Sequence, residues 1–166
     1  MSFEPSHILP KDRRLLVIDD DPDSLAIISE ALNWEGYQVR TSLSGHEGLD
    51  QIQQWSPDLI LLDVNMPGMN GLETLKDLRQ RTQYVSVMFI SGNTSTEHVV
   101  QGLDTGADDY IPKPFAPVEL LARVRTQLRI KDLNDQLRIA NERLKELVDT
   151  DDLTGLLNMR SVYQRL

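Results

Sequence analysis

Five short apolar runs alternate with amphipathic segments between residues 14 and 128, and this alternation strongly restricts the fold. Their length and their branched residues are typical of buried strands. The runs that we interpret as strands are 15–19, 37–41, 58–63, 85–91 and 107–112. Strands that alternate with helices predict a parallel sheet with helices on both faces and right-handed connections. We therefore expect an α/β fold built on a doubly wound, five-stranded parallel sheet.

Helix signals lie between the strand candidates. Asp21 suits the N-cap of a helix that Pro22 opens, and Gly36 is a typical stop signal for it. The helices expected between the strands are 22–35, 45–54, 71–79 and 94–103. The segment 1–13 has two prolines and no apolar periodicity, so we expect a disordered or loosely docked leader there.

Pro117 begins a last helix, and neither glycine nor proline interrupts it before Gly155. An apolar face suited to packing on the sheet lies at Leu121, Val124 and Leu128. Six later residues follow the 3-4 spacing of a coiled coil: Ile130, Leu133, Leu137, Ala140, Leu144 and Leu147. We expect a coiled-coil linker helix at 129–150 that pairs with a second copy of the chain. The alternative is a single amphipathic helix on its own domain.

Charge and composition restrict the partners and the location. The chain carries 26 acidic and 17 basic residues, a net charge of −9, and such a chain repels a phosphate backbone. The basic cluster is interpreted as a solvated helix face: Arg123, Arg125, Arg129 and Lys131. We therefore expect no nucleic-acid partner. The absence of a long apolar stretch, a signal peptide and cysteine predicts a cytoplasmic protein without a membrane partner.

Polar side chains gather where the predicted strands end. They are Asp19, Asp20, Asp21, Asp63, Asn65, Ser91, Tyr110 and Lys113. Ligands of doubly wound sheets bind beyond the carboxyl ends of the strands. Adjacent carboxylates repel, and Mg²⁺ resolves that repulsion because it prefers oxygen ligands. With a lysine and a hydroxyl nearby, this set suits phosphoryl transfer. Taken singly, Asp21 is better explained as an N-cap, while Ser91 also fits a cap of the following helix and Lys113 also fits a surface residue.

These residues give the chain a family resemblance. With Asp19-Asp20, Asp63 in LLDVNMPGMNG, Ser91-Gly92 and GADDYIPKPF at 106–115, it resembles the receiver domain of two-component response regulators. The resemblance covers about residues 14–130, and we place the domain at 14–128. It implies a flavodoxin-like sheet of order 2-1-3-4-5, with the long helix as an extension.

The resemblance also implies a role for each site residue. Asp63 would accept a phosphoryl group from a sensor histidine kinase or a phosphotransfer protein. Asp20 would bind Mg²⁺ directly together with Asp63, Asp19 would bind it through water, and Asn65 would bind it through its backbone carbonyl. Ser91 and Lys113 would hold phosphoryl oxygens, and Ser91 and Tyr110 would act as the switch pair. The Lys113–Pro114 peptide bond would be cis.

A second resemblance lies at 149–166. DTDDLTGLLNMRSVYQRL is similar to the opening of a GGDEF diguanylate cyclase domain, although Met159 replaces the usual arginine and Tyr163 a usual phenylalanine. The chain ends at Leu166, before any catalytic loop. We therefore expect residues 151–166 to be the truncated start of that domain, in a fragment that makes no cyclic di-GMP. The receiver would control the missing cyclase through the coiled-coil helix.

Other functions fit these residues less well. A dimerisation module with a receiver fold and no phosphotransfer is the main alternative, and the complete acid, hydroxyl and lysine set argues against it. A haloacid-dehalogenase-like phosphatase would need an acid where this chain has Asn65. A flavodoxin-like cofactor domain would need a glycine-rich loop after Asp20. The net charge and the LTGL segment argue against a DNA-binding regulator.

Overall fold

A computed structural model describes residues 9–81, 84–92 and 95–150. The strands of the described part are β1 (Arg14–Ile18), β2 (Gln38–Ser42), β3 (Leu59–Asp63), β4 (Ser86–Ser91) and β5 (Asp109–Pro112). The helices are η1 (Pro10–Asp12, a 3-10 turn), α1 (Pro22–Trp34), α2 (Gly45–Trp55), α3 (Gly71–Arg81), α4 (Thr96–Asp104) and α5 (Pro117–Thr150). The expected alternation of strands and helices is therefore confirmed, and the boundaries of the shared elements move by up to two residues.

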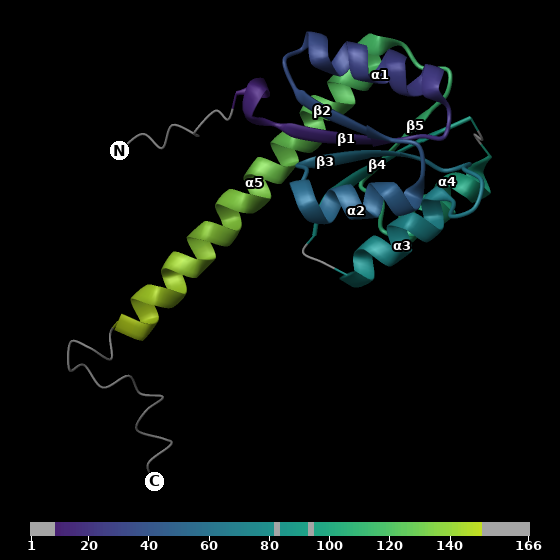
Figure 1. The fold of residues 1–166 in the computed structure, drawn as a ribbon. Coiled ribbons are helices and arrows are strands. Elements are labelled where there is room, and N and C mark those ends of the chain that lie inside the picture. Colours follow the sequence, from purple (N-terminus) through teal and green to yellow (C-terminus); the bar gives the residue numbers. More distant parts are fainter. Residues whose placement is uncertain (1–8, 82–83, 93–94, 151–166) are drawn as a thin grey trace. The chain divides into compact units, whose positions relative to one another are not determined.

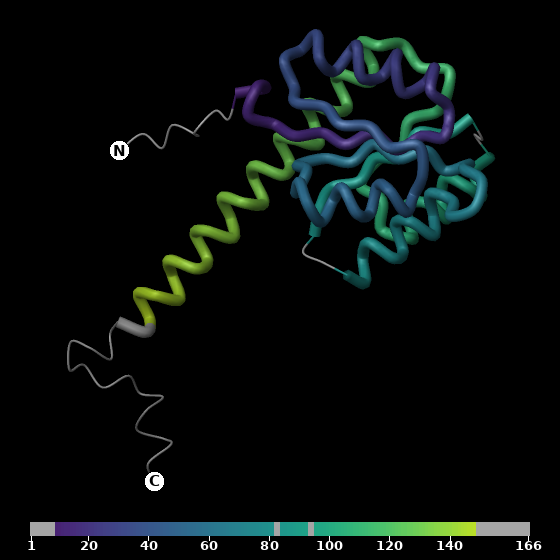
Figure 2. Tube along the Cα trace, in the orientation of Figure 1, coloured from purple at the N-terminus to yellow at the C-terminus, as the bar shows by residue number. Residues whose placement is uncertain are grey.

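The strands of the described residues form one parallel, five-stranded sheet of order β2-β1-β3-β4-β5. The fold class and the strand order are thus as expected. β1 and β3 are neighbours in the middle of the sheet, as the chain trace in Figure 2 shows. Because every pair is parallel, all five strands end at the same edge of the sheet.

Two apolar layers enclose the sheet. α1 and the start of α5 cover one face, and α2, α3 and α4 cover the other (Figure 1). Successive strand residues point to opposite faces, so Leu15 and Val17 join one layer while Leu16 and Ile18 join the other. The central strands are buried on both faces, which explains their uninterrupted apolar sequence.

Two local details go beyond the sequence expectations. The end of the predicted leader contains a 3-10 turn, η1 at Pro10–Asp12, and the Lys11 carbonyl accepts a hydrogen bond from Gln38 Nε2 at 2.7 Å. The preceding residues, 1–8, lie outside the described part. In α5, Leu120 is fully buried and Leu121 only partly, so the face that packs on the sheet begins one residue earlier than expected.

The chain divides into two compact units, Met1–Leu128 and Arg129–Leu166. Helix α5 supplies residues to both units. The second unit contains the predicted coiled-coil seam, whose five large side chains are exposed. The GGDEF-like residues 151–166 lie outside the described residues. In the part of the chain that the structure describes, no helix has the length and apolarity needed to cross a membrane.

Candidate phosphorylation site

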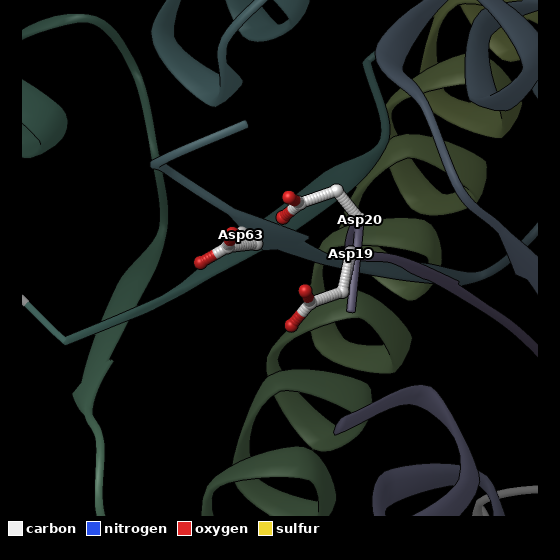
Figure 3. Close-up of side chains that lie close together, drawn as sticks. All are labelled: Asp19, Asp20 and Asp63. Atoms are coloured by element: carbon white, nitrogen blue, oxygen red, sulfur yellow. The ribbon is translucent and has the colours of Figure 1, made fainter. Parts of the chain in front are cut away.

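Three carboxylates meet at the edge of the sheet where the strands end. Asp63 is the last residue of β3, and Asp19 and Asp20 directly follow the neighbouring strand β1. One carboxylate oxygen of each residue lies within 4.8 Å of the others (Figure 3). The register explains this meeting, because Ile18 pairs with Leu62 and the next residue of each strand therefore reaches the same edge. The sequence prediction that these acids converge is borne out geometrically.

Lys113 contacts the two buried carboxylates, Asp19 and Asp63. Its Nζ donates a hydrogen bond of 2.7 Å to Oδ2 of Asp19 and lies 3.6 Å from Oδ1 of Asp63. Asp19 and Asp63 are buried, whereas Asp20 is exposed. The second oxygen of Asp19, Oδ1, accepts a hydrogen bond from the backbone N–H of Asp21 at 2.9 Å. Asp19 is therefore fixed by contacts within the protein, while Asp20 faces solvent beside Asp63.

This environment shifts the proton affinity of Asp63. Burial, together with the negative charges of Asp19 and Asp20, raises the pKa of Asp63 to about 6, although Lys113 opposes the shift. The pKa of Lys113 is also raised, because its hydrogen bond to Asp19 and the charges of both aspartates outweigh the effect of its own burial. At neutral pH the site therefore combines a charged lysine with a carboxylate that is costly to keep ionised.

The donor set fits a hard divalent cation. Among the described residues, these three aspartates are the one group of three or more potential side-chain metal ligands close enough to share an ion. All of its donors are oxygens, the ligand type that Mg²⁺ prefers. A cation here would also relieve the repulsion that raises the pKa of Asp63. The site chemistry is thus compatible with the expected Mg²⁺.

Ser91 and Lys113 reach the same edge from the next two strands. Ser91 is the buried last residue of β4, and its carbonyl accepts a hydrogen bond from the Lys113 N–H at 2.8 Å. The Asn65 side chain lies close by, with Nδ2 3.5 Å from Ser91 Oγ. Lys113 precedes Pro114 through a cis peptide bond, as the resemblance implies. The structure thus brings Asn65, Ser91 and Lys113 to one side of the acid cluster.

The other two candidate residues lie in β5 and at the N-cap of α1. Tyr110 is partly buried in β5 and packs against the apolar layer that contains its strand neighbour Phe89. Asp21 caps α1, since its Oδ1 accepts a hydrogen bond from the Asp23 N–H at 3.1 Å and its Oδ2 one from Ser24 Oγ at 3.0 Å. Asp21 is therefore the helix cap that the sequence favoured.

The loop after Asp63 is positioned by residues that the sequence analysis did not single out. A Cβ at Gly71 would lie 2.3 Å from the carbonyl oxygen of Asp63, so only glycine lets α3 begin this close to β3. Asn70 and Glu73 bind each other's backbone N–H at 2.9 and 3.0 Å. This is a capping box, and the Asn-x-x-Glu spacing before the apolar face of α3 was a signal that could have revealed it.

Comparisons with known proteins agree on one family. The family model named "Response regulator receiver domain" matches residues 15–125. The DNA-binding response regulator MtrA of Mycolicibacterium smegmatis is 42% identical over 117 residues, which are 70% of this chain and 51% of MtrA. The response regulator MprA of Mycolicibacterium vanbaalenii is 43% identical over 116 residues, 70% of this chain and 50% of MprA. This chain thus spans about half the length of these curated relatives.

A solved structure gives the same result. The response regulator receiver domain protein (CheY-like) from Methanospirillum hungatei has a TM-score of 0.70 and 32% identity, and the match covers 74% of this chain and 98% of that chain. The DNA-binding relative MtrA also overturns one expectation. Net charge led us to exclude a nucleic-acid partner, and that exclusion was wrong, because relatives with 42% identity are named as DNA-binding. Net charge over one segment does not decide what a longer protein binds.

Proposed function

Because the chain belongs to the response regulator receiver family, we propose that Asp63 accepts a phosphoryl group from a phosphohistidine of a sensor histidine kinase or a phosphotransfer protein. The observation that carries the proposal is the position of Lys113, whose Nζ lies 3.6 Å from Oδ1 of Asp63 beside two further carboxylates. A single buried acid without a role in phosphoryl transfer would not require a lysine and two further carboxylates beside it. Such a donor would place the chain in the cytoplasm, which is part of the proposal.

The residues divide the work of phosphoryl transfer. One oxygen of Asp63 forms the new bond to phosphorus while the phosphorus–nitrogen bond of the donor breaks. Receiver domains bind Mg²⁺ at an acidic pocket, and Asp20, Asp63, the Asn65 carbonyl and, through water, Asp19 would hold it here. When bound, Mg²⁺ supplies positive charge to the phosphoryl oxygens.

Lys113 neutralises a further phosphoryl oxygen and remains protonated, because its pKa is raised. The Ser91 hydroxyl binds another oxygen of the acquired group. The pairing of Ser91 with Pro112 and of Phe89 with Tyr110 connects β4 to β5, and we propose that movement of Ser91 changes the packing of Tyr110. The signal would then reach α5, which follows β5 in the chain.

Incubation with acetyl phosphate and Mg²⁺ tests the proposal. Intact-mass spectrometry should show one added phosphoryl group on the wild type and none on Asp63→Asn. Asp50→Asn is the matched control, because Asp50 is an exposed acid of α2. The main alternative, a dimerisation module without phosphotransfer, predicts that the wild type gains no phosphoryl group.

For the output we propose control of a GGDEF diguanylate cyclase. Residues 149–166 support it through their resemblance to the opening of such a domain, and α5 supports it as one helix that runs from Pro117 to Thr150. Two copies would pair through the coiled-coil seam of the linker helix and bring two cyclase domains together. The linker at 129–150, the pairing and the cyclase are all parts of this proposal.

A DNA-binding output is the second candidate, because the relatives include the DNA-binding response regulator MtrA. Two assays on the protein purified from its own cells separate the candidates. Formation of cyclic di-GMP from GTP would support the cyclase output. Binding to duplex DNA in the absence of Mg²⁺, by a protein that forms no cyclic di-GMP, would support the DNA-binding output.

A further inference from the structure

The linker seam, the six residues of α5 that follow the 3-4 spacing from Ile130 to Leu147, is an exposed apolar stripe. Its five large side chains are between 42% exposed, for Ile130, and 65% exposed, for Leu147. The remaining seam position is Ala140, which is also exposed. The 3-4 spacing repeats every seven residues, and such a seam matches another helix with the same repeat. A second copy of this chain supplies that repeat by identity.

The charged residues of this helix lie mostly away from the seam. The ion pairs Lys131–Asp135, Arg138–Asp135 and Arg138–Glu142, with separations of 2.6, 4.0 and 3.9 Å, follow the opposite face. No aspartate or glutamate occupies the positions that flank the seam within residues 129–148. Those positions are held by Arg129, Asn134, Gln136, Asn141, Arg143 and Val148. The surface that a partner helix would meet is therefore apolar with a neutral or basic border.

The border residues suit a parallel pair of identical helices. In such a pair, each flanking residue faces the partner residue five positions further along. Arg129 would face Asn134, Gln136 would face Asn141, and Arg143 would face Val148. Two like charges never face each other, so self-pairing carries no electrostatic penalty. An acidic partner helix would be attracted to the arginines, and that is an alternative the experiment below can detect.

Ala140 is the exception within the seam. In a parallel pair the two Ala140 side chains would face each other, and two methyl groups leave a gap where two leucines would fill the layer. The gap lies between the layers of Leu137 and Leu144, near the middle of a seam of only six positions. We propose that the seam pairs in parallel with a second copy and that Ala140 keeps this pairing weak. This proposal rests on the proposed function, in which phosphorylation controls that pairing.

The test measures the dimer dissociation constant of the full chain by sedimentation equilibrium, with and without beryllofluoride and Mg²⁺. Ala140→Leu should lower the dissociation constant by about tenfold or more without beryllofluoride, because it fills the gap. Glu142→Leu is the matched control, since it adds the same side chain on the opposite face. Equal effects of the two variants, or no effect of Ala140→Leu, would overturn the proposal, and so would a wild type that pairs only with an added acidic helix.

Orientation has its own test, because the chain contains no cysteine. Leu133→Cys should form a disulfide-linked dimer on mild oxidation, since residue 133 faces its own copy in a parallel pair. In an antiparallel pair it would face Leu144 instead, and a lack of cross-linking would contradict the parallel arrangement. If Ala140→Leu tightens the dimer but beryllofluoride leaves the wild type unchanged, the role of Ala140 stands and the proposed control by phosphorylation fails.

Discussion

The ammonium group of Lys113 lies 3.6 Å from Oδ1 of Asp63, although one residue follows β5 and the other ends β3. The same nitrogen donates a 2.7 Å hydrogen bond to Asp19. One cation thus stabilises two buried carboxylates, and a third carboxylate, Asp20, lies close to them. Burial of Asp63, together with the negative charges of Asp19 and Asp20 that this cation only partly offsets, raises the pKa of Asp63 to about 6.

Asp63→Asn should stabilise the metal-free protein at neutral pH. The folded state binds the Asp63 proton more tightly than the unfolded chain, so the wild type loses stability as pH rises from about 4 through about 6. Two pKa units correspond to about 3 kcal/mol, and the asparagine variant lacks this loss. Urea unfolding in a chelator at pH 4 and pH 7.5 should show the variant's advantage growing by up to that amount. An advantage independent of pH would contradict the raised pKa.

Lys113→Met should both destabilise the protein and raise the pKa of Asp63 further. It removes the cation that lowers this pKa and leaves buried Asp19 without its charged partner. Loss of one member of a buried pair costs about 3 kcal/mol or more. Carboxyl-carbon NMR titration of Asp63 measures the pKa, and urea unfolding measures the stability. Lys113→Arg keeps the charge and should shift this pKa less; equal shifts would argue against an electrostatic cause.

Gly71→Ala should cost about 2 kcal/mol or more, because its Cβ would lie 2.3 Å from the Asp63 carbonyl oxygen and 2.8 Å from the Val64 Cα. It should also slow phosphorylation, since the strand end that carries Asp63 must shift. Gly92→Ala is the matched control for stability, as its Cβ would meet nothing within 4 Å. Thermal unfolding measures the stability of both variants. Similar losses of stability in Gly71→Ala and Gly92→Ala would show that the close contact at Gly71 is unimportant.

Arg79→Ala should cost about 2 kcal/mol. Its guanidinium donates hydrogen bonds to the carbonyls of Val85 and Gly106, both at 2.8 Å, and to Asp108 Oδ2 at 3.3 Å. Hydrogen bonds that involve a charged group contribute more than neutral ones. Arg81→Ala removes only an exposed pair with Asp77 and should cost about 0.5 kcal/mol or less. Equal decreases of the urea unfolding midpoint in Arg79→Ala and Arg81→Ala would contradict this difference in cost.

The sheet and its working edge could be predicted because parallel strands end together, and the chain places Asp19, Asp63 and Ser91 at successive strand ends. The burial of each acid could not be predicted. Asp19 and Asp20 are adjacent in the sequence, and only the packed structure shows that Asp19 meets Lys113 while Asp20 stays exposed. The charge argument about nucleic acid failed because a partner is chosen by local surface and by the rest of a protein.

Leu120 illustrates a second limit of the sequence. The spacing of Leu121, Val124 and Leu128 matches a helix face, but so does that of Leu120, Val124 and Leu128. Only the angle at which α5 meets the sheet selects Leu120, which is fully buried. The role of Gly71 was hidden for a similar reason, because a close approach of two backbones leaves no pattern in the sequence.

The central claim is that Asp63 is the phosphoacceptor, and site mapping tests it most directly. After incubation with acetyl phosphate and Mg²⁺, borohydride reduction converts a phosphorylated aspartate to homoserine, which tandem mass spectrometry of peptides locates. We predict homoserine at position 63 and at no other aspartate, and no conversion in the Asp63→Asn protein. Conversion at Asp19 or Asp20, or a wild type without any conversion, would contradict the account.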